Sequence, residues 1–335
     1  MTERKLDLEA WVAPATFLTI AMMAVGMILP PFIGMESPEV AGAARYWLQT
    51  VLVCMASVGF VAILVMAVRR VPQPLAAIRA SIDRQRLLSL GLGWFLIAAN
   101  LTAFGLIKPE LGRLGFAADP LLAAADRILF FGADGWRVFE RMRHPFIGEA
   151  YHIVWLGWLF LALTIILWER PSVRKSRLLI VYFLLWSIIG PLVHIALPAA
   201  GPVLDAALTG HGFDGLEVVA SDAQKFNYLL DGYRTATFNP GGGISAMPSL
   251  HIATMAWTVF YWRGPLRWLA IAITAYMWAA SVVLGWHYFV DGLVGIGLVW
   301  AAMARLSYRG GRREEAKSAR SGAPASPPVA PVRLK

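Results

Sequence analysis

Two short polar segments interrupt an otherwise apolar sequence and contain residue types suited to chemistry. The first covers residues 238–251, with three consecutive glycines at 241–243 followed by Pro248, Ser249 and His251. Glycines let a backbone turn freely and approach a ligand closely, and proline is compatible with the first turn of a helix. Free N–H groups at a helix start favour an anion such as phosphate. A glycine run alone is typical of an ordinary loop; joined to Pro-Ser-x-His, it indicates an anion site beside His251.

The second segment, residues 285–292, contains His287 and Asp291. Residues four apart lie on the same face of a helix, one turn from each other. A carboxylate there can accept a hydrogen bond from one imidazole nitrogen, which leaves the other nitrogen free to attack or to take a proton. The simpler alternative is a polar pair that packs two helices together. The spacing leaves both interpretations open.

The composition predicts that lipid surrounds these segments. Of 335 residues, 58% are hydrophobic and 15% are charged, against about 25% charged in ordinary soluble domains. A stretch of about 20 apolar residues crosses a bilayer. We therefore expect an all-α integral membrane protein with about eight spans, at residues 11–32, 46–68, 88–106, 153–168, 178–197, 249–262, 266–284 and 287–306.

The distribution of basic residues predicts the orientation, because short loops rich in Lys and Arg stay cytoplasmic. With the N-terminus inside, 21 of the 30 Lys and Arg residues fall on the cytoplasmic side and nine on the outer side. The protein is then expected in the plasma (inner) membrane, with both termini in the cytoplasm. The net charge of +9 is explained by this topology, so we expect no nucleic-acid partner.

Three regions follow from this pattern. Residues 1–87 form an N-terminal two-helix addition with a cytoplasmic loop. Residues 88–306 form a six-helix membrane domain with outer loops at 107–152 and 198–248. Residues 307–335 are basic and proline-rich, which predicts a disordered cytoplasmic tail. The stretch 127–143 mixes aromatic residues with arginines and suits a segment lying in the membrane interface.

The topology brings the two polar segments together. The sixth and eighth spans both start on the outer side, at Ser249 and His287, so His251 and His287 lie at the same membrane face. The sixth span has only 14 residues, about 21 Å of helix against a hydrocarbon core of about 30 Å. Its polar end is therefore expected below the surface, within reach of a lipid headgroup.

At these residues the sequence resembles the type 2 phosphatidic acid phosphatase superfamily of membrane lipid phosphatases and phosphotransferases. The superfamily's Pro-Ser-Gly-His and His-x-x-x-Asp motifs appear here as residues 248–251 and 287–291, with Leu250 in place of the glycine. The segment 246–251 is most similar to the branch that contains inositol phosphorylceramide synthase. The resemblance covers about residues 88–306, with the first two spans added to a six-helix core.

The resemblance implies roles for the matching residues. His287 attacks phosphorus and becomes a phosphohistidine, Asp291 orients its ring, and His251 protonates the leaving oxygen and then activates the acceptor. Ser249, Leu250 and Gly243 belong to the phosphate-binding segment, where the Ser249 side chain and neighbouring N–H groups hold the phosphoryl oxygens. It implies a phospholipid or lipid phosphate substrate and an acceptor that is water or an alcohol, with neither metal nor cofactor. Transfer to an alcohol is slightly favoured by the branch.

Two departures leave the phosphate clamp undefined. The superfamily's first motif, a lysine six residues before Arg-Pro, has no convincing match, and Ser281 stands where an arginine is expected. Arg234, 17 residues before His251, is the preferred replacement. Weaker candidates are basic residues of the same outer loops, Lys225, Arg137 and Arg141.

Other hypotheses remain open at this stage. His152, Tyr151 and His194 are more typical of structural hydrogen bonding than of catalysis. A transporter or lipid-binding protein would explain a histidine-lined cavity, although transport predicts polar clusters in both halves. An intramembrane serine protease would use Ser245 and a histidine on another span. His251, His287 and Asp291 would also be a plausible zinc ligand set.

Overall fold

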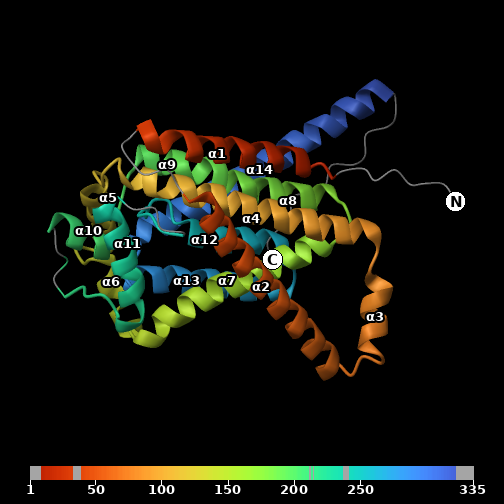
Figure 1. Ribbon diagram of the computed structural model, residues 1–335, viewed down its shortest axis with the longest axis horizontal. Helices are drawn as coiled ribbons and strands as arrows, with labels where there is room; N and C mark the ends of the chain where they lie inside the picture. Colours follow the sequence, from red (N-terminus) through yellow and green to blue (C-terminus); the bar gives the residue numbers. More distant parts are fainter. Residues whose placement is uncertain (1–8, 33–38, 211–212, 214, 237–240, 322–335) are drawn as a thin grey trace.

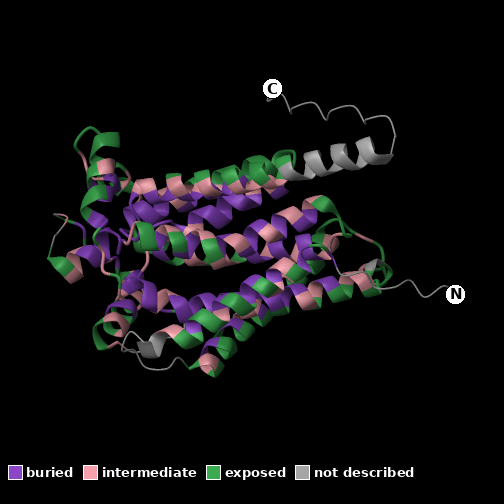
Figure 2. Cartoon of the chain, turned by 90° about the horizontal axis from the view of Figure 1, so that it is seen from above, coloured by how far each residue is buried: buried purple, intermediate pink, exposed green. Residues whose placement is uncertain are grey.

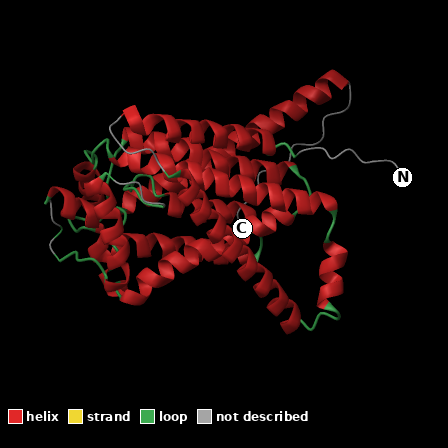
Figure 3. Ribbon diagram, viewed as in Figure 1, coloured by secondary structure: helices red, strands yellow, loops and turns green. Residues whose placement is uncertain are grey.

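The computed structural model describes residues 9–32, 39–210, 213, 215–236 and 241–321, and within these residues every regular element is helical (Figure 3). Seven helical stretches are long and apolar enough to cross a membrane, so the chain is a multi-pass membrane protein. The prediction of an all-α membrane protein is confirmed. The seven stretches are α1 (Val12–Phe32), α2 (Val40–Val68), α4 (Arg84–Gly112), α7 (Pro145–Trp168), the continuous run of α8 (Val173–Leu184), η2 (Leu185–Ile189) and α9 (Gly190–Ala196), α13 (Pro265–Val283) and α14 (Phe289–Ser321).

The expected eighth span is the short helix α12 (Leu250–Tyr261). It lies in the middle of the bundle and packs against α7, α13 and α14 (Figure 1). Ser249 caps its start by accepting a hydrogen bond from the N–H of Ile252. Eight of the 12 residues of α12 are buried and the other four are half-buried, so its few turns are shielded by neighbouring helices.

Short helices gather at one end of the bundle, around the starts of α12 and α14 (Figure 1). They come from the two long loops that the sequence places on one side, whereas α3 (Pro74–Ser81) lies at the opposite end. The short elements are α5 (Asp119–Leu129), α6 (Gly135–Val138), η1 (Glu140–Met142), α10 (Pro202–Thr209), η3 (Ala220–Asp222) and α11 (Ala223–Thr235).

The outer surfaces of the long helices are apolar, as a lipid environment requires. Figure 2 shows buried residues along the inner faces and exposed residues along the outside. Among the exposed residues are Phe17, Phe60, Phe95 and Trp300. Helix α2 is the least buried span; it crosses the bundle obliquely and packs against α4 and α7.

The structure corrects one boundary. Helix α14 continues to Ser321, so residues 307–321 are helical, whereas the sequence predicts a disordered tail from residue 307. Residues 322–335 lie outside the described residues. Residues 127–143 contain the last turn of α5 and the whole of α6 and η1. All three are short elements at one end of the bundle.

A buried ion pair joins the chain's first described residues to the bundle. Lys175, fully buried at the start of α8, donates to Glu9 Oε1 at 2.9 Å and to Ser89 Oγ at 2.7 Å. The carbonyls of Leu167 and Glu169 also accept from its amine. A buried charge is tolerated when it is paired and hydrogen-bonded in this way.

Replacing Lys175 with methionine is therefore expected to destabilise the fold, because Glu9 is left as a buried, unpaired carboxylate. Breaking a buried pair costs about 3–5 kcal/mol. Thermal unfolding in detergent measures the loss, and Arg170→Met, at an exposed position nearby, is the control. The Lys175→Met/Glu9→Gln double variant is expected to lose less stability than the sum of the losses in the two single variants. If the losses of stability are additive, Lys175 and Glu9 do not act as a pair.

Candidate functional site

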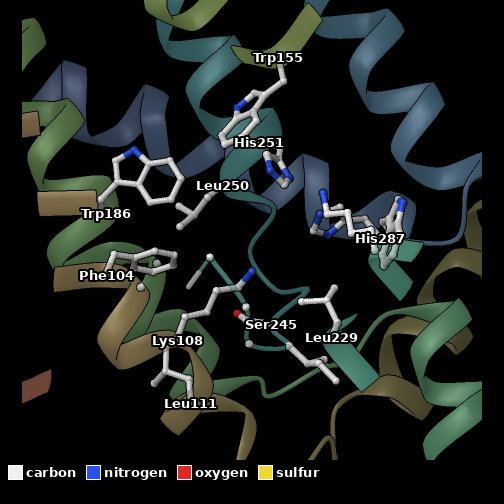
Figure 4. Close-up of a pocket in the computed structure, with 18 of the residues that line it drawn as sticks. Phe104, Lys108, Leu111, Trp155, Trp186, Leu229, Ser245, Leu250, His251 and His287 are labelled. Atoms are coloured by element: carbon white, nitrogen blue, oxygen red, sulfur yellow. The ribbon is translucent and has the colours of Figure 1, made fainter. Parts of the chain in front are cut away.

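One cavity of about 1220 Å³, including the open space at its mouth, lies where the two polar segments meet (Figure 4). Residues from α2, α4, α7, α11, α12 and the glycine segment line it. Both predicted histidines, His251 and His287, are among them. Tryptophan, tyrosine and phenylalanine side chains make up much of the remaining wall, so the cavity suits an amphiphilic ligand.

His287 and Asp291 form the predicted pair. Nδ1 of His287 lies 3.3 Å from Oδ2 of Asp291, and the same oxygen accepts from the N–H of Tyr288 at 3.0 Å. Asp291 is fully buried and His287 is 6% exposed. Since Asp291 faces Nδ1, a proton on that nitrogen leaves Nε2 as the basic, nucleophilic nitrogen.

His251 faces His287 across the cavity. The centroids of the two imidazole rings are 6.1 Å apart. Trp155 meets the His251 ring edge to face with centroids 4.1 Å apart, and Tyr151 does so at 5.6 Å. These aromatic contacts fix the orientation of His251 beside His287.

Ser249 does not line the cavity, contrary to the role expected for its side chain. It is fully buried, and its hydroxyl is used to cap α12. Its backbone N–H donates to the carbonyl of Asp291 at 3.3 Å, which ties the two polar segments together. Leu250 does line the cavity, and the N–H groups of Leu250 and His251 lie in the first helical turn, where no intrahelical acceptor exists.

Gly243 lines the cavity and packs tightly on α4. Its φ of +88° is a conformation that other residues rarely adopt. A Cβ at this position would lie 2.7 Å from the backbone nitrogen of Pro109 and 2.8 Å from the carbonyl carbon of Lys108. The glycine therefore lets the loop reach the end of α4 and lie beside Lys108.

Lys108 is the site residue that sequence reasoning missed. It follows the apolar stretch of the third predicted span, where a lysine is usually interpreted as an interfacial residue. In the structure its side chain points into the cavity on the side opposite the histidines (Figure 4). Within the described part of the chain no hydrogen-bond or ion-pair partner engages its amine.

Lys225, one of the weaker candidates, also lines the cavity. Its amine lies 3.1 Å from Nδ1 of His152, whose Nε2 lies 3.6 Å from Oδ1 of Asp222. Trp286 donates to the other oxygen of Asp222 at 2.8 Å. Burial, together with the nearby charge of Lys108, lowers the pKa of Lys225 to about 8. His152, which the sequence suggested was structural, thus positions a cavity lysine.

The other arginine candidates lie elsewhere. Arg234 is exposed on α11, does not line the cavity and donates to the carbonyl of Ala207 at 3.4 Å. Arg137 lies over the ring of Trp136 and near Asp134; like Arg141 it is absent from the cavity wall. The structure does not place Arg234 at the cavity, because closeness in sequence to the glycine loop does not bring its side chain to the cavity wall. Ser281, where the superfamily has an arginine, is buried and donates to Trp278 in its own helix.

Two carboxylates of α5 hold the backbone around the site. Asp126 accepts from the N–H groups of Phe289 and Val290 at 2.8 and 3.0 Å. Asp119, two turns earlier, accepts from Ala200 and Gly201 at 2.8 and 3.0 Å. Burial raises the pKa of each to about 6, against the opposing effect of these donors. Near neutral pH both carboxylates are charged, and Asp126 fixes the first turn of α14 beside His287.

The structure contains one of the contacts that the serine protease alternative requires, between Ser245 and a histidine on another helix. Ser245 lines the cavity and its Oγ lies 3.0 Å from Nδ1 of His194 on α9. That nitrogen also lies 3.3 Å from the carbonyl of Met247, which makes it the protonated donor. His194 then cannot take the serine proton through Nδ1, so the pair lacks an activated nucleophile.

The zinc alternative is not supported. In residues 9–32, 39–210, 213, 215–236 and 241–321, no group of three or more His, Cys, Asp or Glu side chains is placed to hold a metal ion. Oδ2 of Asp291 bonds to His287 and Tyr288, and Asp291 does not line the cavity.

The fold and paired motifs agree with a comparison against known families. A family model described as the PAP2 superfamily matches residues 121–305, more than half of the chain. The chain belongs to this superfamily, which supports a phosphatase-type function on lipid phosphates. Neither the curated proteins nor the solved structures contain a match.

The lowered pKa of Lys225 predicts how phosphate binding depends on pH. A phosphate monoester is fully dianionic above pH 7, whereas Lys225 loses its charge as the pH rises through about 8. KM for an aryl phosphate is expected to rise about tenfold between pH 7.5 and 9.5. Lys225→Arg keeps the charge at this position and makes the rise smaller, and Lys225→Gln has a high KM throughout. A wild-type KM that is constant over this range would refute the assignment.

Proposed function

We propose that this protein is a membrane lipid phosphatase or phosphotransferase that acts through a phosphohistidine at His287. The observation that carries the proposal is the placement of His251 and the His287–Asp291 pair on one cavity, with imidazole centroids 6.1 Å apart. A phosphoryl group between the rings can approach both histidines at about 3–3.5 Å, the separation needed for reaction. One histidine then serves as nucleophile and the other as acid.

In the first half-reaction Nε2 of His287 attacks phosphorus, and the bond from phosphorus to the lipid oxygen breaks. His251 donates a proton to that oxygen, so the lipid leaves as an alcohol. Asp291 accepts a hydrogen bond from Nδ1 and stabilises the positive charge that develops on the ring. The products are a free lipid alcohol and phosphohistidine.

In the second half-reaction His251, now neutral, takes a proton from water or from an acceptor alcohol. The acceptor oxygen attacks phosphorus, and the bond between phosphorus and Nε2 breaks. Water gives inorganic phosphate, and an alcohol gives a new phosphate ester. For a phosphodiester substrate the same steps transfer a headgroup, as expected for the inositol phosphorylceramide synthase-like branch that the motif segment resembles.

Negative charge on the phosphoryl oxygens is balanced by donors of this chain. The N–H groups of Leu250 and His251 lie at the positive end of α12. Lys108 and Lys225 supply the cationic charge, replacing the superfamily's first motif. Gly243 permits the loop to pass close to Lys108. The proposed chemistry therefore uses side chains and backbone donors alone.

The orientation of the site follows from the loops that surround it. The cavity lies at the end of the bundle formed by loops 107–152 and 198–248, which carry few basic residues compared with the opposite side. We therefore place it at the outer face of the plasma membrane, with both termini cytoplasmic. Residues 88–306 then form the catalytic domain and residues 1–87 an addition that contributes α2 to the cavity wall.

Replacing His287 with alanine is expected to abolish the phosphoenzyme and to lower kcat at least 10³-fold, because it removes the nucleophile. Incubation with a ³²P-labelled lipid phosphate is stopped in alkaline detergent, which preserves phosphohistidine, and loss of the bound label on later treatment with acid identifies it. His144→Ala is the control, since His144 is exposed at the start of α7 and caps that helix. Retention of label or turnover in His287→Ala would overturn the mechanism.

The acceptor is identified by product analysis with the same labelled lipid. Purified protein is incubated with the lipid alone and then with a polyol or a ceramide. Transfer produces a new labelled lipid or ester at the expense of inorganic phosphate, whereas a hydrolase releases phosphate in equal amounts in every reaction. Release of phosphate alone in all reactions contradicts the preference for transfer.

A further inference from the structure

The hydroxyl of Ser245 belongs to the cavity wall, and the phosphohistidine mechanism leaves it without a role. Ser245 is half-buried in the segment between the three glycines and α12, and it lines the cavity. Its Oγ lies 3.0 Å from Nδ1 of His194. Within the described residues no second hydrogen bond engages this hydroxyl. A hydroxyl has one proton to donate and two lone pairs that accept, so one contact does not use all of its capacity.

The direction of the hydrogen bond between Ser245 and His194 follows from a second contact of the same nitrogen. Nδ1 of His194 also lies 3.3 Å from the carbonyl oxygen of Met247, and a carbonyl oxygen can only accept. A proton on Nδ1 satisfies both contacts, whereas a bare Nδ1 would face the carbonyl lone pair to lone pair. His194 therefore donates to Oγ of Ser245, and the hydroxyl keeps its own proton for another acceptor.

His194 and the main chain hold the hydroxyl from outside the cavity. The His194 side chain is fully buried on α9 and does not line the cavity. On one side of Ser245 the backbone of Gly243 packs against α4. On the other side the N–H of Ala246 donates to the carbonyl of Ala199 at 2.8 Å. Ser245 is thus a preorganised donor, and the acceptor for its proton has to come from the cavity.

Lys108 lies on the same side of the cavity as Ser245, and both face the histidines across it (Figure 4). A Cβ on Gly243, two residues before Ser245, would lie 3.0 Å from Cγ of Lys108, so the glycine segment runs along the lysine side chain. No hydrogen bond joins the lysine amine to the serine hydroxyl. Both donors are therefore available to one ligand.

An ammonium group beside a neutral hydroxyl donor suits an anionic oxygen, because hydrogen bonds to ionised acceptors are short and strong. A phosphoryl group has several non-bridging oxygens. It can pair with the amine and accept from the hydroxyl while its phosphorus still faces the histidines. The hydroxyl of Ser249, which the motif assigns to phosphate, caps α12 instead. Ser245 is a second serine of the same segment, and its proton is free.

We propose that Ser245 binds phosphate by donating a hydrogen bond to a non-bridging oxygen of the phosphoryl group, and that His194 is the positioning residue that aims its proton. This inference rests on the proposed function and adds a donor to the site. No bond to Oγ of Ser245 forms or breaks, and the hydroxyl stays protonated in both half-reactions. The same donor therefore serves the substrate and the phosphohistidine.

Replacing Ser245 with alanine is expected to lower kcat/KM for an aryl phosphate about 10- to 100-fold, because the anion loses one hydrogen bond. Ser245→Thr keeps the hydroxyl and stays within about threefold of wild type. Ser281→Ala is the matched control, since Ser281 is buried, does not line the cavity and donates its proton to the carbonyl of Trp278. A kcat/KM for Ser245→Ala within twofold of wild type would overturn the proposal.

The positioning role of His194 is tested by a double-mutant cycle. His194→Leu removes the donor and is expected to lower kcat/KM about as much as Ser245→Ala, whereas His194→Asn keeps an N–H near the place of Nδ1 and restores most of the activity. In the Ser245→Ala background His194→Leu causes no further loss, because its effect passes through the hydroxyl. Additive losses would show that His194 acts through packing and overturn its positioning role.

Binding measurements distinguish this inference from the proposed function. In the His287→Asn protein, Kd for inorganic phosphate is measured with ³²P-phosphate. Ser245→Ala is expected to raise this Kd about tenfold, and Ser281→Ala to leave it unchanged. A Kd unchanged by Ser245→Ala overturns the Ser245 assignment even if wild-type protein forms phosphohistidine. A raised Kd in a protein that forms no phosphohistidine overturns only the catalytic proposal.

A fluorophosphonate tests the direction of the hydrogen bond between Ser245 and His194. A serine whose proton is taken by a histidine is an activated nucleophile and becomes covalently labelled. Because His194 donates to Ser245, no label is expected at Ser245 when the modified protein is digested and its peptides are analysed by mass spectrometry. Stoichiometric labelling of Ser245 would show that His194 accepts the serine proton, and would overturn the proposal.

Discussion

The site depends on the close approach of α12 to α14. A Cβ at Gly295 on α14 would lie 2.9 Å from the carbonyl oxygen of Ser249, so only glycine allows this spacing without a shift. One turn earlier, the carbonyl of Asp291 accepts the N–H of Ser249. These main-chain contacts fix the separation of His251 from His287, although 35 residues lie between them in the sequence.

Around this junction the carboxylates are engaged by hydrogen bonds, whereas within the described residues neither cavity lysine forms a salt bridge, and Lys225 contacts His152 instead. Asp119 and Asp126 each accept two backbone N–H groups, Asp222 accepts from Trp286, and Asp291 accepts from Tyr288 and pairs with His287. The cavity itself receives Lys108 and Lys225. The electrostatic field inside the cavity is therefore positive, even though four acidic residues lie close by. An anionic ligand meets fixed donors and does not have to displace a salt bridge.

The features that the sequence predicts correctly are those that depend on local periodicity. The spans, the start of α12 near Ser249 and the pairing of His287 with Asp291 follow from runs of apolar residues and from spacing within one helix. The lysine that lines the cavity could not be found this way, because Lys108 belongs to a different helix and reaches the glycine loop only through tertiary packing at Gly243. Arg234 is the opposite case, since it is near the loop in sequence but lies exposed on α11 and does not line the cavity. The sequence does not predict that residues 307–321 are helical, because their charge and the prolines that follow them favour a disordered tail. In the structure these residues continue α14.

The α5 carboxylates have a consequence for how this protein can diverge. Asp119 and Asp126 bind backbone N–H groups, and α12 meets α14 through its main chain, so the backbone positions of the two histidines do not depend on the wall side chains of α2, α4 or η2. Wall residues on α2, α4 and η2 can therefore be exchanged without disturbing the reacting atoms. Such a separation lets new substrate ranges arise by drift in α2, α4 and η2 while the two motif segments, residues 248–251 and 287–291, are retained.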